Sequence, residues 1–524
     1  MNRSPMLDKR SLFLSALFMV MIVIIAGGMA IYVLSDPAIS DALSLTAAAF
    51  RIDQVYHDEV QWQTAIKGAR GAIFEKLDRY SAYLEREDLK NLDDELEGSY
   101  SGIGVSIVFH EQGLLIMSVR ESGPAAEVGL LSGDIIVAVD SVSLRNLEGE
   151  EAIWLLRGEE GTEARLKIDR PATDESFEVV VTRRRLTLMH IPFAGYTPDS
   201  MIYIRLLDFD AGATDDVRVA VDSLLAARET TPKGIILDLR GNPGGFLAEG
   251  YRTADLFLNE GIFMVGTDGR SRWNNQKHYS TGQDVSDGLP MAIIVDGGTA
   301  SAGEIAAGAL QAADRAVLIG DTTFGKGLVQ GYVRFPDGDG LRLTVSRYYF
   351  EGPVYLNEFD STLHEIGHGL TPDFYFDASR SNPFRRELEN SLLLGQFAAR
   401  NEDEIVYSML VGAVGDSLVD RFIAYARENG FSYTSPRTLL AEQLKEVAEV
   451  EAGFAATFDR IDAIIRSSKK EDDATPGKER DYIRQRLLQI AYERKYGLYH
   501  TYKDILIQSR PEIAYASRIL LEGH

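Results

Sequence analysis

Cysteine is absent from this chain of 524 residues, and its absence excludes two kinds of site. The protein forms no disulfide bonds and offers no thiolate ligands to zinc. Basic residues are scarce, with 54 Lys and Arg against 79 Asp and Glu, which gives a formal net charge of −25. An acidic chain repels phosphate groups, so we expect no nucleic-acid partner.

One long hydrophobic run is present, residues 11–34, which carry no charge and as a helix span the roughly 30 Å hydrocarbon core of a bilayer. Basic residues precede this run and acidic residues follow it (Arg3, Lys9 and Arg10, then Asp36 and Asp41). The positive-inside rule therefore predicts a single-pass anchor in the cytoplasmic (inner) membrane, with the rest of the chain on the extracytoplasmic or periplasmic side. A cleaved signal peptide is the alternative, but residues 28–30 match its cleavage site poorly.

Beyond this run, the pattern of the sequence predicts a multidomain α/β protein, and the length implies two to four domains. In the central part, strands alternate with helices, which indicates a largely parallel sheet. We expect a cytoplasmic N-terminus (1–10), the transmembrane helix (11–34), a helical segment (36–97), a compact module of short strands and two helices (98–185), an α/β core (186–380) and a C-terminal helical domain (381–524).

The C-terminal region carries apolar residues at helical spacing, for example Leu388, Leu392 and Leu393. Such stripes are buried either against one another, as a helical domain, or in a surface for self-association or for an adaptor. We expect a homo-oligomer formed through these helices. We also expect the charged stretch 467–480 to be a loose connection.

The clearest candidate for chemistry is Ser301, which follows the strand predicted at 291–295 and opens the next helix. Free N–H groups and the positive end of a helix dipole at such a position can stabilise an oxyanion. A purely structural interpretation is also open, because Ser301 and Glu304 have the spacing of a capping box.

A second candidate, Lys326, follows the strand predicted at 316–319 and is flanked by Gly325 and Gly327. Close backbone packing at these glycines favours burial of the amine, and burial lowers a lysine pKa towards the value that a general base needs. Gln330 is placed to orient the amine if this segment makes a helical turn. A phosphate-binding loop fits poorly, since Gly327 stands where that motif has Ser or Thr.

The third segment, residues 237–245 (LDLRGNPGG), is a predicted strand that ends in a glycine turn. Gly244 and Gly245 can present a backbone N–H to a tetrahedral intermediate. A pair of glycines is also common in ordinary turns between a strand and a helix.

In this order, the three segments resemble the motifs of the carboxy-terminal processing peptidases, also called tail-specific proteases. The family pattern is L-D-L-R-x-N-x-G-G, then G-T-A-S-A-S-E, then T-F-G-K-G-x-V-Q. The resemblance implies a serine protease that needs no metal or cofactor, with Ser301 as nucleophile, Lys326 as general base and Gln330 as its orienting partner. It also implies an oxyanion hole formed by the N–H groups of Gly245 and Ala302.

Two departures from the family pattern stand near these residues: Gly303 replaces the second serine, and Gly241 replaces an asparagine. Neither change removes an atom with an implied catalytic role. Upstream, residues 77–84 resemble the family's L-D-P-Y-S-x-Y-L segment, with Arg79 in place of proline.

Residues 101–107 (SGIGVSI) resemble the carboxylate-binding loop of a PDZ domain, and residues 122–134 resemble the PDZ signature, with Val128 at its small position. PDZ domains add a peptide to a sheet edge and capture its terminal carboxylate on backbone N–H groups. The resemblance implies protein substrates with free C-terminal tails, bound by the loop Gly102, Ile103, Gly104 and Val105.

Two alternatives remain: a catalytically silent PDZ scaffold, and a zinc peptidase that uses His364, Glu365 and His368 in a literal H-E-x-x-H. That zinc motif requires a helix, whereas Gly369 and Pro372 follow it at once. The segment fits better the G-x-G-[IL]-x-P-D that closes the peptidase core of the family. The other histidines stand alone, so a lysine base is the economical choice for Ser301 (His57, His110, His190, His278, His500 and His524).

Overall fold

In the computed structural model, the chain forms two compact units, Met1–Arg79 and Tyr80–His524. The described residues are 18, 21, 35–86, 89, 99–110, 112–120, 122–145, 150–171, 173–187, 189–227, 230–336, 338–352, 354–359, 365–376, 382–410, 415–450 and 458–523.

The described part of the first unit contains the helices α2 (Pro37–Val55) and α3 (Trp62–Phe74), in the region where the sequence predicts a helical segment. The predicted anchor, residues 11–34, lies outside the described residues except for Phe18 and Met21. Among the residues that are described, no helix is long and apolar enough to cross a membrane.

In the second unit, residues 99–187 form a small β-rich module. Its main sheet has the strand order β3-β4-β5-β7-β8, which places β3 at one edge. Alternating side chains of β7, Ala164, Leu166 and Ile168, are fully buried in the core of the module. The elements are β2 (Ser99–Gly102), β3 (Val105–His110), β4 (Gly113–Val119), α5 (Pro124–Glu127), β5 (Ile135–Val139), β6 (Val142–Ser143), α6 (Glu150–Leu156), β7 (Glu163–Arg170), β8 (Glu175–Thr182) and β9 (Arg184–Thr187).

The α/β core is built on a sheet with the order β10-β11-β12-β15-β16-β22, in which β10 is antiparallel to β11 and the other neighbours are parallel. Every residue of β12 and β15 is buried, which is why these strands read as continuous apolar runs in the sequence. The strands are β10 (Phe193–Tyr196), β11 (Met201–Arg205), β12 (Gly234–Asp238), β15 (Met291–Val295), β16 (Ala316–Gly320) and β22 (Phe374–Tyr375).

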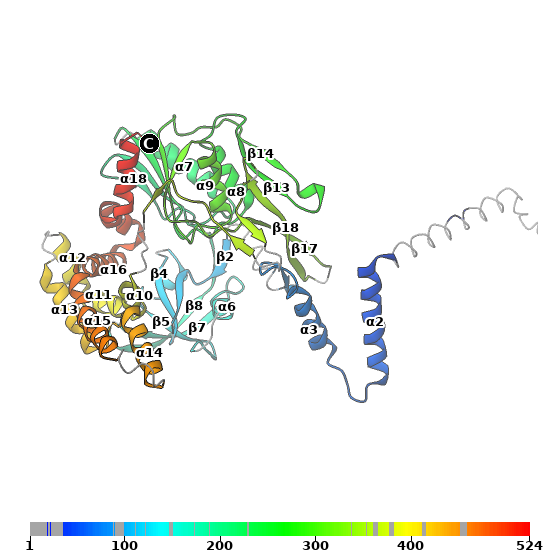
Figure 1. The fold of residues 1–524 in the computed structure, drawn as a ribbon, viewed down its shortest axis with the longest axis horizontal. Coiled ribbons are helices and arrows are strands. Elements are labelled where there is room, and N and C mark those ends of the chain that lie inside the picture. Colours follow the sequence, from blue (N-terminus) through cyan, green and yellow to red (C-terminus); the bar gives the residue numbers. More distant parts are fainter. Residues whose placement is uncertain are drawn as a thin grey trace, which may run out of the picture. The chain divides into compact units, whose positions relative to one another are not determined.

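Helices cover both faces of this sheet. On one face lie α7 (Ala213–Ala227), α8 (Leu247–Asp255) and α9 (Ala302–Ala312), which share a core with the strands. On the other face lies α18 (Pro511–Leu521), the last helix of the chain (Figure 1). The carboxyl ends of β12 and β15 are adjacent, so the loops that follow them meet at one edge of the sheet.

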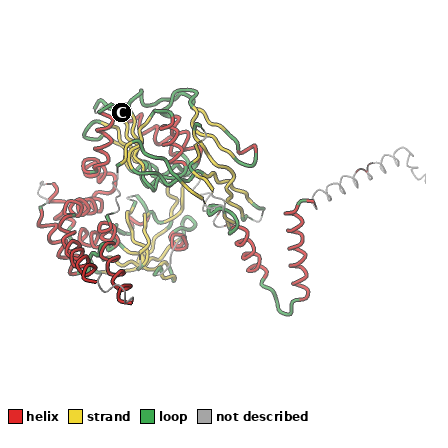
Figure 2. The backbone as a smooth tube through the Cα atoms, viewed as in Figure 1, coloured by secondary structure: helices red, strands yellow, loops and turns green. Residues whose placement is uncertain are grey.

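A second sheet, largely antiparallel, stands beside the core and contributes the long strand β18 (Gly340–Phe350) (Figure 2). Its partner β17 (Leu328–Arg334) directly follows the Lys326 segment. The remaining strands of this sheet are β1 (Ala82–Leu84), β13 (Phe263–Asp268), β14 (Lys277–Tyr279) and β19 (Val354–Tyr355).

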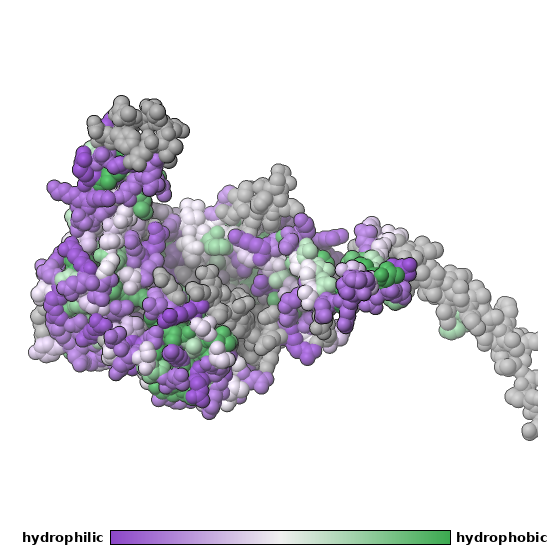
Figure 3. Space-filling view, turned by 90° about the horizontal axis from the view of Figure 1, so that it is seen from below, coloured by the Kyte–Doolittle hydropathy of each residue, from purple (hydrophilic) through white to green (hydrophobic). Residues whose placement is uncertain are grey.

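The C-terminal region is helical, as predicted. Helices α10–α13 and α16 share an apolar core that includes Phe384, Phe397 and Phe422, whereas α14 and α15 pack on each other through Ala441, Ile461 and Ile465. The face seen in Figure 3 is largely hydrophilic, in keeping with the charge of the chain. The helices are α10 (Pro383–Asn390), α11 (Leu393–Arg400), α12 (Glu402–Leu410), α13 (Asp416–Glu428), α14 (Pro436–Val450), α15 (Phe458–Lys478) and α16 (Arg480–Thr501).

The expected loose connection at 467–480 is wrong, because most of this stretch continues helix α15. Several of its charged residues contact α14: the Lys469 amine lies 2.7 Å from a Glu442 carboxylate oxygen. The Thr438 hydroxyl donates to the buried carboxylate of Asp472 at 2.6 Å. Charged residues that are typical of a solvated loop here make polar contacts between the two helices α14 and α15.

Candidate active site

Ser301 stands in a strained turn between β15 and α9. Its backbone has φ +53° and ψ −116°, a conformation that residues other than glycine rarely adopt. An ordinary N-cap residue has extended dihedrals instead, so capping alone does not explain this geometry. Strain of this kind persists where the surroundings enforce it, and it is concentrated at functional sites.

The carboxylate of Glu304 holds the backbone of Ser301 in this turn by a hydrogen bond. Glu304 has no exposed surface and accepts four hydrogen bonds from two different loops. The donors are the N–H of Ser301 (2.9 Å), the Thr323 hydroxyl (2.5 Å), the N–H of Gly325 (2.7 Å) and the N–H of Lys326 (2.9 Å). Burial raises the pKa of Glu304 above its ordinary value, although the four hydrogen bonds oppose this effect. One buried carboxylate thus joins the serine turn to the lysine loop.

A second link between the two loops is the buried hydroxyl of Tyr348 on β18. It donates to the carbonyl of Lys326 and lies 3.3 Å from the carbonyl oxygen of Ser301. Burial raises the pKa of Tyr348 well above its ordinary value, so the hydroxyl keeps its proton. The amine of Lys326 lies 4.9 Å from the centre of the Tyr80 ring. Tyr80 belongs to the segment 77–84 that resembles a family motif, whereas the sequence contains no signal for Tyr348.

Gln330 lies in strand β17, so the helical turn considered as a way for it to reach Lys326 is not formed. The ladder between β17 and β18 is irregular between Val329 and Gln330, and such bulges often redirect a side chain next to an active site. The amide nitrogen of Gln330 donates to the Thr344 hydroxyl at 2.9 Å. Its amide oxygen is buried and has no hydrogen-bond partner among the described residues. The side chain therefore keeps one acceptor available.

Ser301, Lys326 and Gln330 line the same pocket, which has a volume of about 250 Å³. The sequence predicts these three residues from two separate segments, and the structure brings them together. Most of the remaining wall is apolar and includes Phe246, Leu247, Ile305 and Leu328. Gly245 also lines this pocket.

The glycine turn packs directly against the start of α9. A Cβ on Gly244, whose φ is +99°, would lie 2.8 Å from the nitrogen of Ala302 and 2.8 Å from the Cβ of Ser301. Only glycine permits this approach. Within the described part of the chain, the N–H groups of Gly245 and Ala302 have no hydrogen-bond partner. Both are available to a ligand beside Ser301.

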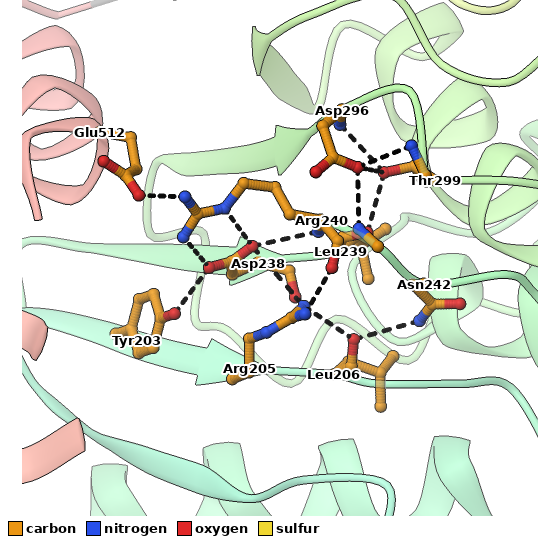
Figure 4. Close-up of polar contacts among 12 residues, drawn as sticks. Tyr203, Arg205, Leu206, Asp238, Leu239, Arg240, Asn242, Asp296, Thr299 and Glu512 are labelled. Atoms are coloured by element: carbon orange, nitrogen blue, oxygen red, sulfur yellow. Dashed lines mark hydrogen bonds and ion pairs between the residues drawn. The ribbon is translucent and has the colours of Figure 1, made fainter. Parts of the chain in front are cut away.

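Polar contacts join the glycine turn to the loop that precedes Ser301 (Figure 4). The Asp296 carboxylate accepts from the N–H groups of Gly241 (2.8 Å) and Gly298 (2.9 Å). The Thr299 hydroxyl donates to the carbonyl of Leu239 at 2.8 Å. The two loops therefore form one hydrogen-bonded unit at the carboxyl ends of β12 and β15.

In the β-rich module, the predicted peptide-binding loop connects β2 to the edge strand β3. It consists of Gly102, Ile103, Gly104 and Val105. Ile103 is buried, so it can contribute only its backbone. The carbonyls of Ile103 and Gly104 already accept hydrogen bonds, from the N–H groups of Ala125 and Arg120 respectively. A ligand at this loop would therefore meet N–H donors more than carbonyl acceptors.

The zinc alternative requires a helix at residues 364–368, but the structure has a strand within this segment. Glu365–Gly367 form β21, which pairs with β20 (Asn357–Phe359). His364 lies outside the described residues. Among the residues that are described, no group of His, Asp and Glu is arranged to hold a metal ion.

Comparison with known proteins agrees with this geometry. The family model of peptidase family S41 matches residues 200–375, and a PDZ domain model matches residues 101–181. The carboxy-terminal-processing protease of Bartonella bacilliformis is 30% identical over 347 residues, which cover 65% of this chain and 77% of that protein. The chain belongs to this family. It is a serine-type peptidase with a PDZ domain, and the resemblance seen in the sequence is confirmed.

Two further proteins are similar to parts of this chain. The carboxyl-terminal-processing protease of Synechocystis sp. is 36% identical over 301 residues, 56% of this chain and 66% of that protein. Among solved structures, the photosystem II D1 C-terminal processing protease is 24% identical and covers 63% of this chain and 86% of that one, with a TM-score of 0.40. The two family models lie within the predicted ranges 98–185 and 186–380.

Replacing Glu304 by Gln tests the hydrogen bonds that connect the Ser301 turn to the Lys326 loop. An amide offers one acceptor atom where four donors need two, so at least one donor loses its partner and the serine turn relaxes. We expect kcat to fall about 100-fold, since a misplacement of about 1 Å has this effect in other enzymes. Steady-state kinetics on a peptide substrate measure the change.

Glu249→Gln is the matched control, because Glu249 is also a buried glutamate that accepts a backbone N–H, from Thr214 at 2.9 Å. It lies on α8 and makes no described contact with Ser301 or Lys326. We expect it to lower stability with little change in kcat. Equal losses of kcat in the two variants would contradict the proposed role of Glu304.

Proposed function

We propose that this protease cleaves proteins near their C-termini by acyl-enzyme chemistry with a Ser301–Lys326 dyad. The observation that carries the proposal is the meeting of Ser301, Lys326 and Gln330 in one pocket, with Ser301 in a strained turn. A silent scaffold would need none of these three side chains, and it would gain nothing from the strain.

In the proposed reaction, the neutral amine of Lys326 removes the proton from Ser301 Oγ as that oxygen attacks the scissile carbonyl carbon. The negative charge that develops on the carbonyl oxygen is stabilised by the N–H groups of Gly245 and Ala302. The resulting ammonium of Lys326 then donates its proton to the departing amine. Water completes the cycle by the same route, with Lys326 again as base, and releases the new C-terminus.

Gln330 supports Lys326 in this scheme. Its amide nitrogen is held by Thr344, which leaves the buried amide oxygen to accept a hydrogen bond from the Lys326 amine. An acceptor at this position fixes the direction of the amine without adding a charge. We therefore assign Gln330 as an orienting residue.

We also propose that the PDZ domain selects substrates by their free C-terminus. The edge of β3 can pair with an extended peptide, and the loop Gly102–Val105 can supply N–H donors to its carboxylate. The apolar wall of the catalytic pocket suits apolar side chains next to the scissile bond. Two weakly selective sites would then act on one polypeptide tail.

Ser301→Ala and Lys326→Ala should each abolish cleavage, because nucleophile and base act as one unit and a single loss costs nearly as much as both. Gln330→Ala should cost less, since it removes only orientation. Cleavage of a protein substrate, followed by gel or mass spectrometry, measures all three variants. Substantial activity in Lys326→Ala would contradict the dyad, and activity that is lost only with a metal chelator would favour the zinc alternative.

Amidation of the C-terminus of a good substrate tests selection by the PDZ domain. Removing the terminal negative charge should raise KM and leave the cleavage site unchanged, because backbone N–H donors prefer a carboxylate. Equal KM values for the free acid and the amide would exclude the PDZ loop from substrate selection.

We propose that residues 11–34 anchor the protein in the inner membrane, with the catalytic part on the periplasmic side. The charge-free run and the basic residues before it support this proposal. Alkaline carbonate extraction of membranes that carry the full chain should leave the protein in the pellet. Its release into the supernatant would contradict the anchor.

We further propose that the C-terminal helices mediate self-association or the binding of an adaptor. Apolar residues on α14 support this, since Leu439, Leu440 and Leu444 are 49%, 59% and 57% exposed. Sedimentation of the part that follows the proposed anchor should reveal a homo-oligomer. A monomer at micromolar concentration would contradict self-association.

A further inference from the structure

We propose that the C-terminal helix α18 contributes to the active site. Its Glu512 acts as a positioning residue for the turn 241–245, called here the oxyanion turn because it contains Gly245. The route runs from Glu512 through Arg240 to the turn 241–245. This inference rests on the proposed oxyanion role of Gly245. It assigns a function to a segment that lies beyond the residues matched by the S41 family model.

Helix α18 is built into the core of the peptidase. Its apolar side chains Ile513, Ala516, Ile519 and Leu520 are buried against the central strands of the sheet. The packing is close, since a Cβ on Gly234 of β12 would lie 3.0 Å from a methyl group of Leu520. Figure 1 shows α18 on the sheet face opposite α7, α8 and α9. The first turn of α18 therefore has a fixed position relative to β12.

Glu512, in that first turn, reaches the guanidinium of Arg240 (Figure 4). Arg240 also binds the fully buried Asp238 through two bonds, Nε to Oδ1 at 2.9 Å and Nη2 to Oδ2 at 2.5 Å. Glu512 is itself only 5% exposed. Arg240 is thus held between two carboxylates, one from β12 and one from the C-terminal helix.

The electrostatics favour this arrangement. Burial opposes the ionisation of Asp238, but the charges of Arg240 and Arg205 outweigh it and hold the pKa of Asp238 well below its ordinary value. Arg510 lies 3.4 Å from Glu512. Two carboxylates therefore face three guanidinium groups in a largely buried cluster. Loss of the Glu512 charge would leave this cluster more positive, with Arg240 free to turn away from α18.

The backbone of Arg240 leads directly into the oxyanion turn. Its carbonyl accepts a hydrogen bond from Arg205, and the next residue, Gly241, donates to Asp296. Asn242 then accepts from the N–H of Ala300 at 2.9 Å and, through its side chain, from the N–H of Gly244 at 2.9 Å. Any shift of Arg240 is therefore transmitted to Gly245 and to the turn that carries Ser301.

This route also links the reaction to the C-terminal helical region. Helix α16 bends at Gly497, where φ is +80°, and is followed by the π-helical turn η3 (Tyr502–Leu506), α17 (Ile507–Ser509), the extended residue Arg510 and α18. The C-terminal helical region is thus connected to Glu512 by a short stretch of chain.

The test is Glu512→Gln in the full-length protein, which keeps the shape of the side chain and removes its charge. We expect kcat to fall about tenfold while KM stays within about twofold, because the change affects the transition state rather than substrate binding. The affinity for a peptide boronic acid, whose tetrahedral adduct on Ser301 occupies the oxyanion site, should fall in parallel. Glu522→Gln, on the exposed end of the same helix, should change neither value.

Leu520→Ala separates positioning from general stability. Leu520 is 4% exposed and makes no described contact with Arg240, whereas its neighbour Leu521 is 52% exposed and serves as the control site. Leu520→Ala should lower Tm at least as much as Glu512→Gln but reduce kcat less, when both are assayed well below Tm. Leu521→Ala should change neither.

Two results would overturn the inference: wild-type kcat and boronate affinity in Glu512→Gln, or losses of kcat that follow Tm across all four variants. The proposed function is tested separately by Ser301→Ala. If Ser301→Ala is inactive and Glu512→Gln is normal, only the role of α18 is wrong. If Ser301→Ala is active, the assignment of the nucleophile is wrong, whatever Glu512→Gln shows.

Discussion

The active site depends on one buried carboxylate, that of Glu304. It accepts hydrogen bonds from the serine turn and from the lysine loop, which lie 25 positions apart in the sequence. A buried carboxylate without donors would be costly, so the two loops are stable only when they come together around it. The N–H of Ser301, whose backbone is strained, donates to this same carboxylate.

The parallel sheet provides the frame for this joint. The carboxyl ends of β12 and β15 are neighbours, so the glycine turn and the serine turn lie side by side. Gly244 permits a contact that any side chain would block, which leaves the N–H groups of Gly245 and Ala302 beside Ser301. On the opposite face of the sheet, α18 holds Arg240 at the base of the same turn. Both faces of the sheet thus contribute to one site.

The sequence predicts the frame well because its signals are local. The buried strands β12 and β15 are apolar runs in the sequence. The segments that contain Ser301 and Lys326 are rich in glycine, and each follows an apolar run. The sequence places Gln330 in the site but does not predict the strand that carries it, because the pairing of β17 with β18 is a long-range contact. Glu304 was seen only as a capping residue, since its contacts with Thr323 and Gly325 cross two loops. The packing of α18 on the sheet has no local signal.

In the proposed mechanism, Lys326 activates Ser301 within a single preformed site. Labelling by a fluorophosphonate tests it most directly, because this reagent reports the nucleophilicity of a serine without the need for a substrate. Intact-mass and peptide mass spectrometry should show a single adduct, on Ser301. The labelling rate should fall strongly in Lys326→Ala, in which the base is missing. An adduct on another residue, or an unchanged labelling rate in Lys326→Ala, would contradict the account.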